Sequence, residues 1–247
     1  MPGRVLRFML VVIHVLQGVL TTAVILPSLS PVQRDVRVRQ WSARLMRILR
    51  IRVCVSGDWP SVESHPLILT SNHVSWVDIF ALHSVHPVRF VSKAEVRHWP
   101  VFGWLAEKTG TLFLERGSRR QTAAIGESMA STLAAGESLG LFPESTTSTG
   151  ESLLPFHSSM LQAAVGRGVP VLPVFLTYRL EDGSLNPYVP YVGEMTFVES
   201  FVRILNAPPS RVNIRVGPLV SSQGLHRRDL ALQLEQITWQ LLQTPSP

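Results

Sequence analysis

Cysteine and charged residues are scarce in this sequence. The one cysteine among its 247 residues, Cys54, cannot form a disulfide within the chain, and its place in the apolar run 51–55 predicts an inert core position. Charged residues make up 16% of the chain and hydrophobic residues 45%, which is apolar for a soluble enzyme. We therefore expect a membrane-associated protein, long enough for one large α/β domain with a sizeable core.

Acidic residues are in the minority. Lysine and arginine number 23 against 17 aspartate and glutamate residues, which gives a net charge of +6. Such an excess suits either nucleic acid or an anionic lipid surface. The basic residues adjoin the most apolar segment and do not alternate with exposed aromatic residues, which argues against nucleic acid. We expect membrane lipids as the partner, and no nucleic acid.

No charged residue interrupts the apolar run 8–26. The run is long enough to cross a bilayer as a helix, though barely. Arg4 and Arg7 precede it as in a signal peptide, but no small-x-small cleavage site follows, so we predict an uncleaved membrane anchor over residues 1–30. Whether it spans the bilayer or lies in one leaflet stays open. If it spans the cytoplasmic (inner) membrane, the basic flank that follows places the rest of the chain on the cytoplasmic side.

Residues 31–50 form a basic amphipathic pattern. An apolar stripe at helical spacing is flanked by arginines. One interpretation is a helix on the surface of an anionic membrane, and the other is a helix packed on the domain with a solvated basic face. The stripe consists of Val38, Trp41, Leu45, Ile48 and Leu49, and the arginines are Arg37, Arg39, Arg44, Arg47 and Arg50.

Short apolar runs alternate with helical patterns over residues 51–243. This alternation predicts a single α/β domain, with a mixed, mostly parallel sheet flanked by helices. We expect strands at 51–56, 67–70, 88–91, 110–114, 138–142, 169–178 and 212–216, and helices at 76–85, 121–135, 158–165, 197–205 and 226–242.

A histidine and an acidic residue stand between the strand 67–70 and the helix that follows. Five residues apart on a helix, two side chains point about 140° apart. His73 and Asp78 can therefore meet only if His73 lies in the turn and Asp78 in the first helical turn. Asp78 would then hold one imidazole nitrogen while the other faces a pocket, as in a general base. Alternatively, Ser75-x-x-Asp78 is a capping box, in which the carboxylate only satisfies backbone N–H groups.

Two further turns carry polar groups out of apolar runs, at 113–117 and 141–146. Loops that leave one edge of a parallel sheet collect active-site groups. We expect Arg116 and the hydroxyl-rich turn at Ser145 and Thr146 to join the histidine. A base, an arginine and hydroxyls can hold an anionic group and deprotonate a hydroxyl beside it.

Four blocks, in order, resemble the glycerolipid acyltransferases, specifically the 1-acyl-sn-glycerol-3-phosphate acyltransferases. The likeness covers nearly the whole chain. His-x4-Asp alone is a weak signal, whereas four blocks at family-like intervals are specific. They are Asn72-His73-Val74-Ser75-Trp76-Val77-Asp78, Phe113-Leu114-Glu115-Arg116, Phe142-Pro143-Glu144-Ser145-Thr146 and Val169-Pro170-Val171-Leu172-Pro173-Val174.

The resemblance implies a mechanism and a set of site residues. An acyl group passes directly from acyl-CoA or acyl-carrier protein, the co-substrate, to the free hydroxyl of 1-acyl-sn-glycerol-3-phosphate, giving phosphatidic acid. It implies no acyl-enzyme, no metal and no other cofactor. The implied roles are base for His73, orienting acid for Asp78, acceptor binding for Arg116, Glu144, Ser145 and Thr146, and an acyl or donor site for Val171 and Pro173.

Two departures from the family pattern concern the acceptor. The third block of the family usually reads Phe-Pro-Glu-Gly-Thr-Arg, whereas this chain has Ser145 for the glycine and Thr147 for the arginine. A missing arginine removes one bidentate phosphate contact. Lyso-ornithine lipid, which has no phosphate, is therefore an alternative acceptor within the same reaction class.

Two other patterns suggest different chemistry. Gly136-Glu137-Ser138-Leu139-Gly140 matches the G-x-S-x-G of a serine lipase or esterase, but the order here is helix, turn, strand, whereas a nucleophile elbow needs strand, turn, helix. His83 and His86 follow Asp78, but their spacing fits no zinc pattern. We expect a loop at Ser138 and partly buried or surface histidines.

Overall fold

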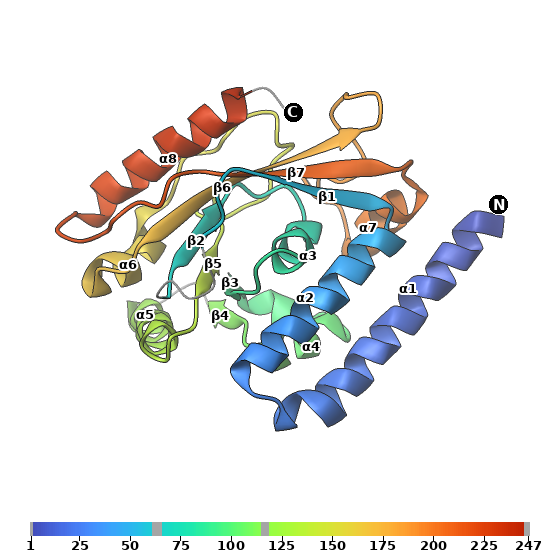
Figure 1. Ribbon diagram of the computed structural model, residues 1–247, viewed down its shortest axis with the longest axis horizontal. Coiled ribbons are helices and arrows are strands. Elements are labelled where there is room, and N and C mark those ends of the chain that lie inside the picture. Colours follow the sequence, from blue (N-terminus) through green and yellow to red (C-terminus); the bar gives the residue numbers. More distant parts are fainter. Residues whose placement is uncertain (1, 61–65, 115–118, 245–247) are drawn as a thin grey trace.

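The computed structural model describes residues 2–60, 66–114 and 119–244 (Figure 1). Its centre is a seven-stranded sheet with the strand order β1-β7-β6-β2-β5-β3-β4. All neighbours pair in parallel except β6 and β7, which pair antiparallel. The predicted mixed, mostly parallel sheet is confirmed. The strands are β1 Ile51–Ser56, β2 Ile68–Ser71, β3 Arg89–Lys93, β4 Leu112–Leu114, β5 Leu139–Leu141, β6 Val171–Leu180 and β7 Ser210–Val216.

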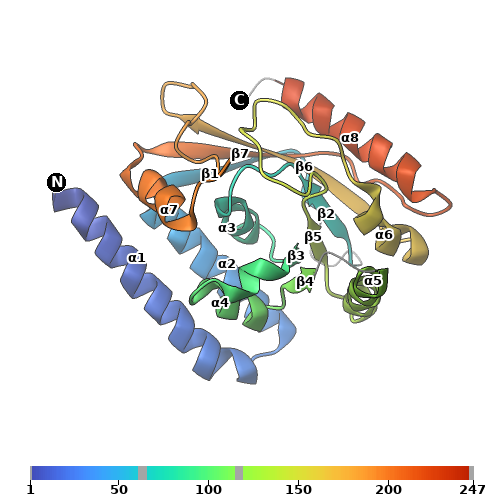
Figure 2. The same ribbon diagram turned by 180° about the vertical axis from the view of Figure 1, so that it is seen from behind.

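Helices cover both faces of the sheet (Figures 1 and 2). Buried side chains of α2, α3 and α7 pack on one face, and those of α5, α6 and α8 on the other. A short 3-10 helix, Ala94–His98, precedes α4, so residues 93–104 are mainly helical. The helices are α1 Pro2–Leu20, α2 Pro31–Ile48, α3 Val77–His83, α4 Phe102–Lys108, α5 Arg119–Ala134, α6 Gln162–Arg167, α7 Phe197–Asn206 and α8 Arg227–Gln243.

Strand β6 divides its side chains between the two faces, because successive residues of a strand point to opposite sides. Leu176 and Tyr178 lie in the cluster with α2, α3 and α7. Val171 lies in the cluster with α8. Pro173 lies on the same side, because its ring and the side chain of Ile237 in α8 both approach the Cβ position of Gly217. Even-numbered positions of β6 therefore face α3.

Helix α1 is docked on the domain along its length. It lies antiparallel beside α2 (Figure 1). The rings of His14 and Trp41 stack with centroids 4.5 Å apart, Trp41 Nε1 donates to the His14 carbonyl at 3.1 Å, and His14 Nε2 lies 3.0 Å from the Trp41 carbonyl. Near the other end, the Arg7 guanidinium donates to the carbonyls of Leu205 and Ala207 at the end of α7. The inner side of α1 is thus part of the fold.

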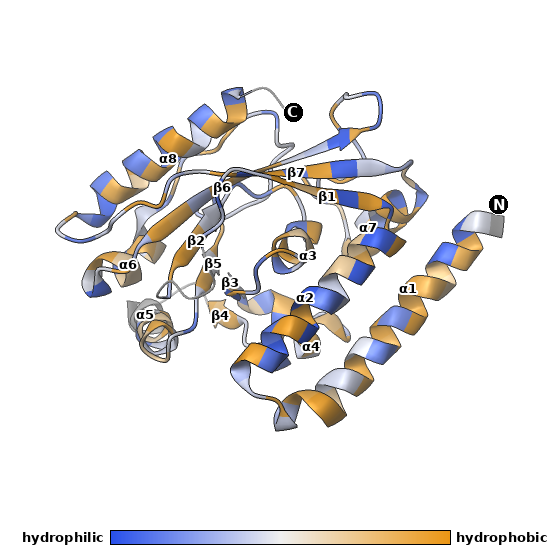
Figure 3. Cartoon of the chain, in the orientation of Figure 1, coloured by the Kyte–Doolittle hydropathy of each residue, from blue (hydrophilic) through white to orange (hydrophobic). Residues whose placement is uncertain are grey.

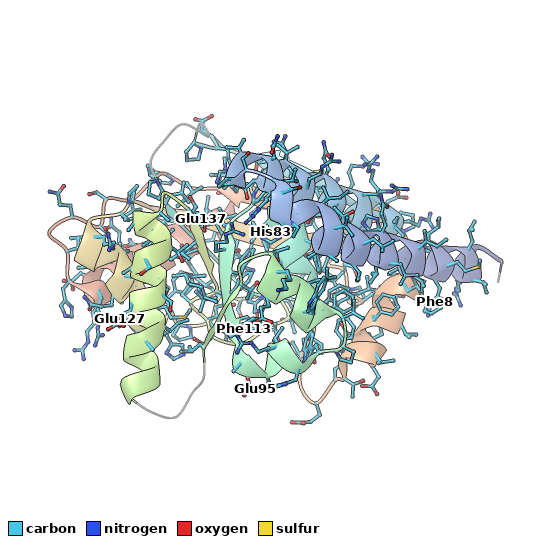
Figure 4. All side chains as sticks on the ribbon, turned by 90° about the horizontal axis from the view of Figure 1, so that it is seen from below. Phe8, His83, Glu95, Phe113, Glu127 and Glu137 are labelled. Atoms are coloured by element: carbon cyan, nitrogen blue, oxygen red, sulfur yellow. The ribbon has the colours of Figure 1, made fainter. Side chains whose placement is uncertain are left out.

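The outer side of α1 is apolar (Figure 3). Figure 4 shows Phe8, near the free end of the helix, at the margin of the molecule. Residues 3–28 are long and apolar enough to cross a membrane, by length and composition. Helix α2 buries Leu45 and Met46 in the core and leaves its arginines exposed except Arg34, which matches the interpretation of a helix packed on the domain. The large apolar residues of α1 that are more than half exposed are Val5, Leu6, Met9, Ile13, Leu16 and Leu20.

Cys54 does not lie in the core as expected. It is half-buried on β1, and β1 is an edge strand with β7 as its one neighbour. An edge strand on the rim of a sheet receives cover from fewer elements than a central strand, so its alternate residues stay accessible.

We expect Gly18→Ala to weaken the docking of α1. A Cβ atom at Gly18 would lie 2.6 Å from Trp41 Nε1, so the indole must move, at a cost of ~1–3 kcal/mol against a gain of ~1 kcal/mol in helix propensity. Thermal unfolding and the rate of proteolysis within residues 21–30 measure the effect. The matched control is Gly3→Ala, because nothing lies within 4 Å of its Cβ position. Equal behaviour of the two variants would contradict this account of the contact.

Candidate active site

The site is built on the end of β2, a buried strand between β5 and β6. The side chain of Asn72 fixes the point where the chain leaves this strand. Its Nδ2 donates to the Leu176 carbonyl at 3.0 Å, and its Oδ1 accepts from the Leu176 N–H at 2.7 Å. The amide thus replaces a backbone pair and holds the next residue, His73, against β6.

His73 and Asp78 meet as the spacing required. His73 lies in the turn, Asp78 lies in the first turn of α3, and His73 Nδ1 is 2.8 Å from Asp78 Oδ2. The carboxylate is fully buried, while the imidazole is 20% exposed. A carboxylate can only accept, so Nδ1 carries the proton and Nε2 is left as a base. Nε2 accepts no hydrogen bond from any residue that the structure describes.

The capping interpretation holds only for the carboxylate of Asp78, because the Ser75 hydroxyl has no hydrogen-bond partner among the described residues. Its Oδ2 accepts the N–H groups of Val74 at 2.7 Å and Ser75 at 2.9 Å. Its Oδ1 accepts the hydroxyl of Tyr178 at 2.8 Å. One carboxylate therefore shapes the turn and orients the imidazole at the same time.

An aromatic column fixes the plane of the imidazole. The His73 ring stacks on Phe142, with centroids 3.9 Å apart and an interplanar angle of 12°. Phe142 stacks in turn on Phe90 at 5.3 Å and 5°. Carboxylate and phenyl ring together leave the imidazole one orientation, which is what a positioned base requires.

Glu144 has a different position from the one expected. It is only 2% exposed, and its two carboxylate oxygens accept the N–H groups of His73 and Leu154, each at 2.8 Å. It therefore joins the turn after β5 to the turn after β2 rather than facing an acceptor. Burial raises the pKa of Glu144 to about 7, although the two N–H groups act in the opposite direction.

The backbone at Ser145 shows why the family has a glycine at this position of the turn. Ser145 has φ = +59°, a left-handed conformation that glycine adopts freely and that costs other residues roughly 1 kcal/mol or more. Thr146 is exposed. The hydroxyl of Thr147, at the position of the family's arginine, donates to the carbonyl of Tyr191, and the N–H of Tyr191 donates to the Val74 carbonyl at 2.9 Å.

The structure does not bring every predicted residue to the dyad. Val171 and Pro173 pair with Ile68 and Thr70 of β2, five and three residues before His73, and both point to the α8 face. They are buried in the sheet away from α3, so we do not place an acyl or donor site there. Arg116 lies outside the described residues.

The G-x-S-x-G match and the two histidines after Asp78 have structural roles. The Ser138 hydroxyl accepts the Leu67 N–H at 3.1 Å in a helix-turn-strand setting, at the opposite end of the strands from His73. His83 is buried more completely than expected (Figure 4). Its Nε2 lies 2.9 Å from the Val88 carbonyl, and burial lowers its pKa to about 4. His86 packs on Trp59. Within the described ranges, no group of three His, Cys, Asp or Glu side chains could hold a metal ion.

The sequence interpretation missed an apolar cavity that is lined by other residues of α3 than Asp78. It has a volume of about 130 Å³ and lies between the α1–α2 hairpin, α3 and α4. Trp76, two residues before Asp78, is one of its walls. The segments that meet here are distant in the sequence, so only aromatic enrichment could have signalled them. The lining includes Gly18, Trp41, Trp76, Phe80, Trp99, Phe102, Ala106 and Phe197.

Comparison with known proteins identifies an α/β enzyme that transfers acyl groups. Residues 52–177 match the model of the acyltransferase family. A lyso-ornithine lipid O-acyltransferase of Pseudomonas aeruginosa is 42% identical over 198 residues, which cover 80% of this chain and 75% of that protein. A 1-acyl-sn-glycerol-3-phosphate acyltransferase of Neisseria gonorrhoeae is 42% identical over 122 residues, covering 49% of this chain and 48% of that protein. This chain belongs to the acyltransferase family and is an O-acyltransferase.

The fold is also that of a solved acyltransferase structure. The crystal structure of the 1-acyl-sn-glycerophosphate acyltransferase PlsC from Thermotoga maritima matches with a TM-score of 0.72, over 99% of this chain and 97% of that one, at 18% identity. The family resemblance and the fold class predicted from the sequence are both confirmed.

We expect Glu144→Gln to destabilise the protein most strongly at acid pH. The amide turns an acceptor oxygen into a donor facing an N–H group, which costs ~1–3 kcal/mol. Burial raises the pKa of Glu144 from 4.5 to about 7, so the native wild type binds this proton more tightly than the unfolded chain. Wild-type stability from this group is fully present below about pH 4.5 and declines toward about pH 7.

Urea unfolding of both proteins in detergent, from about pH 5 to about pH 8, measures this difference. The gap in unfolding free energy between wild type and variant should narrow as the pH rises. A gap that is constant over this range would show that Glu144 is ionised in the native state throughout.

Proposed function

We propose that this enzyme moves a fatty acyl group from a thioester, acyl-CoA or acyl-carrier protein, to the free hydroxyl of a lysolipid. The observation that carries the proposal is the His73–Asp78 pair with Nε2 unpaired among the described residues. Nε2 takes the hydroxyl proton as the oxygen attacks the thioester carbonyl. The tetrahedral intermediate expels the thiolate, which takes the proton from the imidazolium, and Asp78 stabilises that imidazolium.

Lyso-ornithine lipid is the acceptor that we favour. Relatives named for this acceptor align over most of the chain, in Pseudomonas aeruginosa and, at 36% identity over 74% of this chain, in Brucella abortus. The third block lacks the arginine that would grip a phosphate, and the hydroxyl of Thr147 at that position binds the Tyr191 backbone instead. A head group without a phosphate fits such a turn better.

1-Acyl-sn-glycerol-3-phosphate is the second candidate acceptor, and phosphatidic acid would then be the product. The second block retains Arg116, and a guanidinium suits a phosphate. Relatives named for this acceptor match about half of the chain. The acceptor panel described below separates the two candidates.

We place the acyl chain in the apolar cavity instead of along Val171 and Pro173. Trp76, two residues before Asp78 in the sequence, is one of the aromatic and aliphatic side chains that line the cavity. Burial of apolar surface contributes roughly 0.8 kcal/mol per CH₂ group. A thioester whose chain enters here would have its carbonyl end near the catalytic turn.

We further propose that the enzyme lies on the cytoplasmic face of the cytoplasmic membrane, with α1 in one leaflet. Its inner side is docked on α2 and α7, so a spanning orientation would draw the domain into the bilayer. The outer side offers exposed Leu6, Ile13 and Leu16 to lipid. Exposed arginines on α2 suit anionic head groups.

His73→Ala should fold normally and lose nearly all transfer, since a general base contributes about 10²–10⁴-fold in rate. The assay uses purified protein in detergent, palmitoyl-CoA, and a panel of lysolipids, with thiol release as the readout. Wild type should prefer lyso-ornithine lipid to 1-acyl-sn-glycerol-3-phosphate by at least tenfold. His98→Ala, at an exposed position, should match wild type. Undiminished transfer by His73→Ala would end the assignment of the base.

Ala106→Phe should shift the donor preference toward shorter acyl chains, because the new ring fills part of a cavity of about 130 Å³ that Ala106 lines. Rates with acyl-CoA of increasing chain length measure the shift. Short donors should keep their wild-type rate, while long donors lose ~10-fold or more. Ala134→Phe, at an exposed position on α5, is the control. An equal loss for all chain lengths would place the acyl chain elsewhere.

A further inference from the structure

Tyr178 lies outside the four sequence blocks, yet its hydroxyl reaches the acid of the dyad. We propose that Tyr178 is a positioning residue, which acts through Asp78 to set the orientation and proton affinity of His73. The proposal rests on the proposed function of the dyad, and it extends the arrangement to three groups, from the turn after β2, from α3 and from β6.

The two oxygens of Asp78 have different partners. Oδ2 lies within 2.9 Å of three nitrogens, those of the His73 ring and of the Val74 and Ser75 backbone. In the described part of the chain, Oδ1 accepts one hydrogen bond, from Tyr178 at 2.8 Å. Asp78 is fully buried and Tyr178 is 3% exposed. Among the described residues, the phenol of Tyr178 is thus the group that stabilises Oδ1 of this buried carboxylate.

The phenol cannot follow the carboxylate if it moves. The backbone of Tyr178 pairs with Val212 of β7, and its carbonyl accepts the Asn186 N–H at 3.0 Å. Leu176 lies two residues before Tyr178 on the same strand, and the side chain of Asn72 binds both its N–H and its carbonyl. The turn that carries His73 and the strand that carries Tyr178 are therefore locked in register, and the phenol holds Asp78 at a fixed rotation.

A hydrogen bond to a carboxylate stabilises its charge and lowers its affinity for a proton. If the phenol hydroxyl is removed, the carboxylate attracts the Nδ1 proton more strongly, and the imidazolium becomes more stable. His73 should then be protonated, and so inactive as a base, over more of the neutral range. Burial and the nearby Asp78 raise the pKa of Tyr178 well above its usual value, so the phenol itself stays a donor throughout.

Tyr178→Phe removes the hydroxyl and keeps the ring, and Tyr188→Phe is the control, since Tyr188 is 37% exposed. Titration of ¹⁵N-histidine-labelled protein by NMR reports the His73 ring directly, with the signal assigned by its loss in His73→Ala. We expect the His73 ring signals to change at a higher pH in Tyr178→Phe than in wild type, because the carboxylate then attracts the Nδ1 proton more strongly. Glu144 binds the His73 N–H, and burial raises the pKa of Glu144 to about 7. A change of rate with pH could therefore come from Glu144, so the histidine signal is measured directly as well.

The pH profile of kcat/KM gives the second readout. In Tyr178→Phe the acid limb should move to higher pH by the same amount, with kcat about tenfold lower at neutral pH, partial recovery at alkaline pH, and an unchanged KM for the donor. In an Asp78→Asn background, removal of the hydroxyl should have little further effect on rate, because the route runs through the carboxylate.

A uniform loss of rate at every pH, or an unmoved His73 signal in folded Tyr178→Phe, would overturn the proposal in favour of a purely structural phenol. If Tyr178→Phe does not fold, difluorotyrosine in a Tyr188→Phe, Tyr191→Phe background tests the same contact, because Tyr178 is then the sole tyrosine of three. The stronger donor should shift the His73 pKa downward. Failure of the proposed function would show as no acyl transfer by wild type, whereas the NMR titration does not depend on turnover.

Discussion

The catalytic end of this protein depends on one buried negative charge. A carboxylate without water around it is costly unless donors surround it, and Asp78 meets that requirement with an imidazole, two backbone N–H groups and a phenol. These donors come from the turn after β2 and from β6, while the acid itself sits on α3. Satisfying the charge therefore fixes the turn, the start of the helix and the neighbouring strand relative to one another.

A second buried carboxyl group extends the same logic to the next loop. Glu144 binds the N–H of His73 on one side and that of Leu154 on the other, so the turn after β5 is attached to the base through its backbone. The two acids differ in their surroundings. Asp78 has four donors and a ring that can carry a positive charge, whereas Glu144 has two neutral N–H groups, and burial raises its pKa to about 7. One acid orients the imidazole of His73, and the other sets the position of its main chain.

Local patterns in the sequence predicted the dyad and most of the sheet. The five-residue spacing of His73 and Asp78 permits contact in one arrangement of turn and helix, and alternating runs 51–243 specify an α/β sheet. Contacts between distant segments were beyond such patterns. The family resemblance implied an acceptor-binding role for Glu144, whereas its carboxylate binds the N–H groups of His73 and Leu154. The alternation of side chains along β6 could have predicted which of its residues face α3. Even-numbered positions such as Tyr178 face α3, whereas Val171 and Pro173 face α8.

The N-terminal helix makes contacts that composition alone does not predict. His14 and Gly18 lie within the apolar run, and both help to dock α1, one by stacking on Trp41 and the other by leaving room for its indole. Gly18 and Trp41 also line the apolar cavity. The helix whose outer side exposes apolar residues thus supplies a wall of the cavity with its inner side. If α1 detached from the domain, the cavity would open to solvent. The same docked helix therefore presents the exposed apolar side chains and closes the cavity.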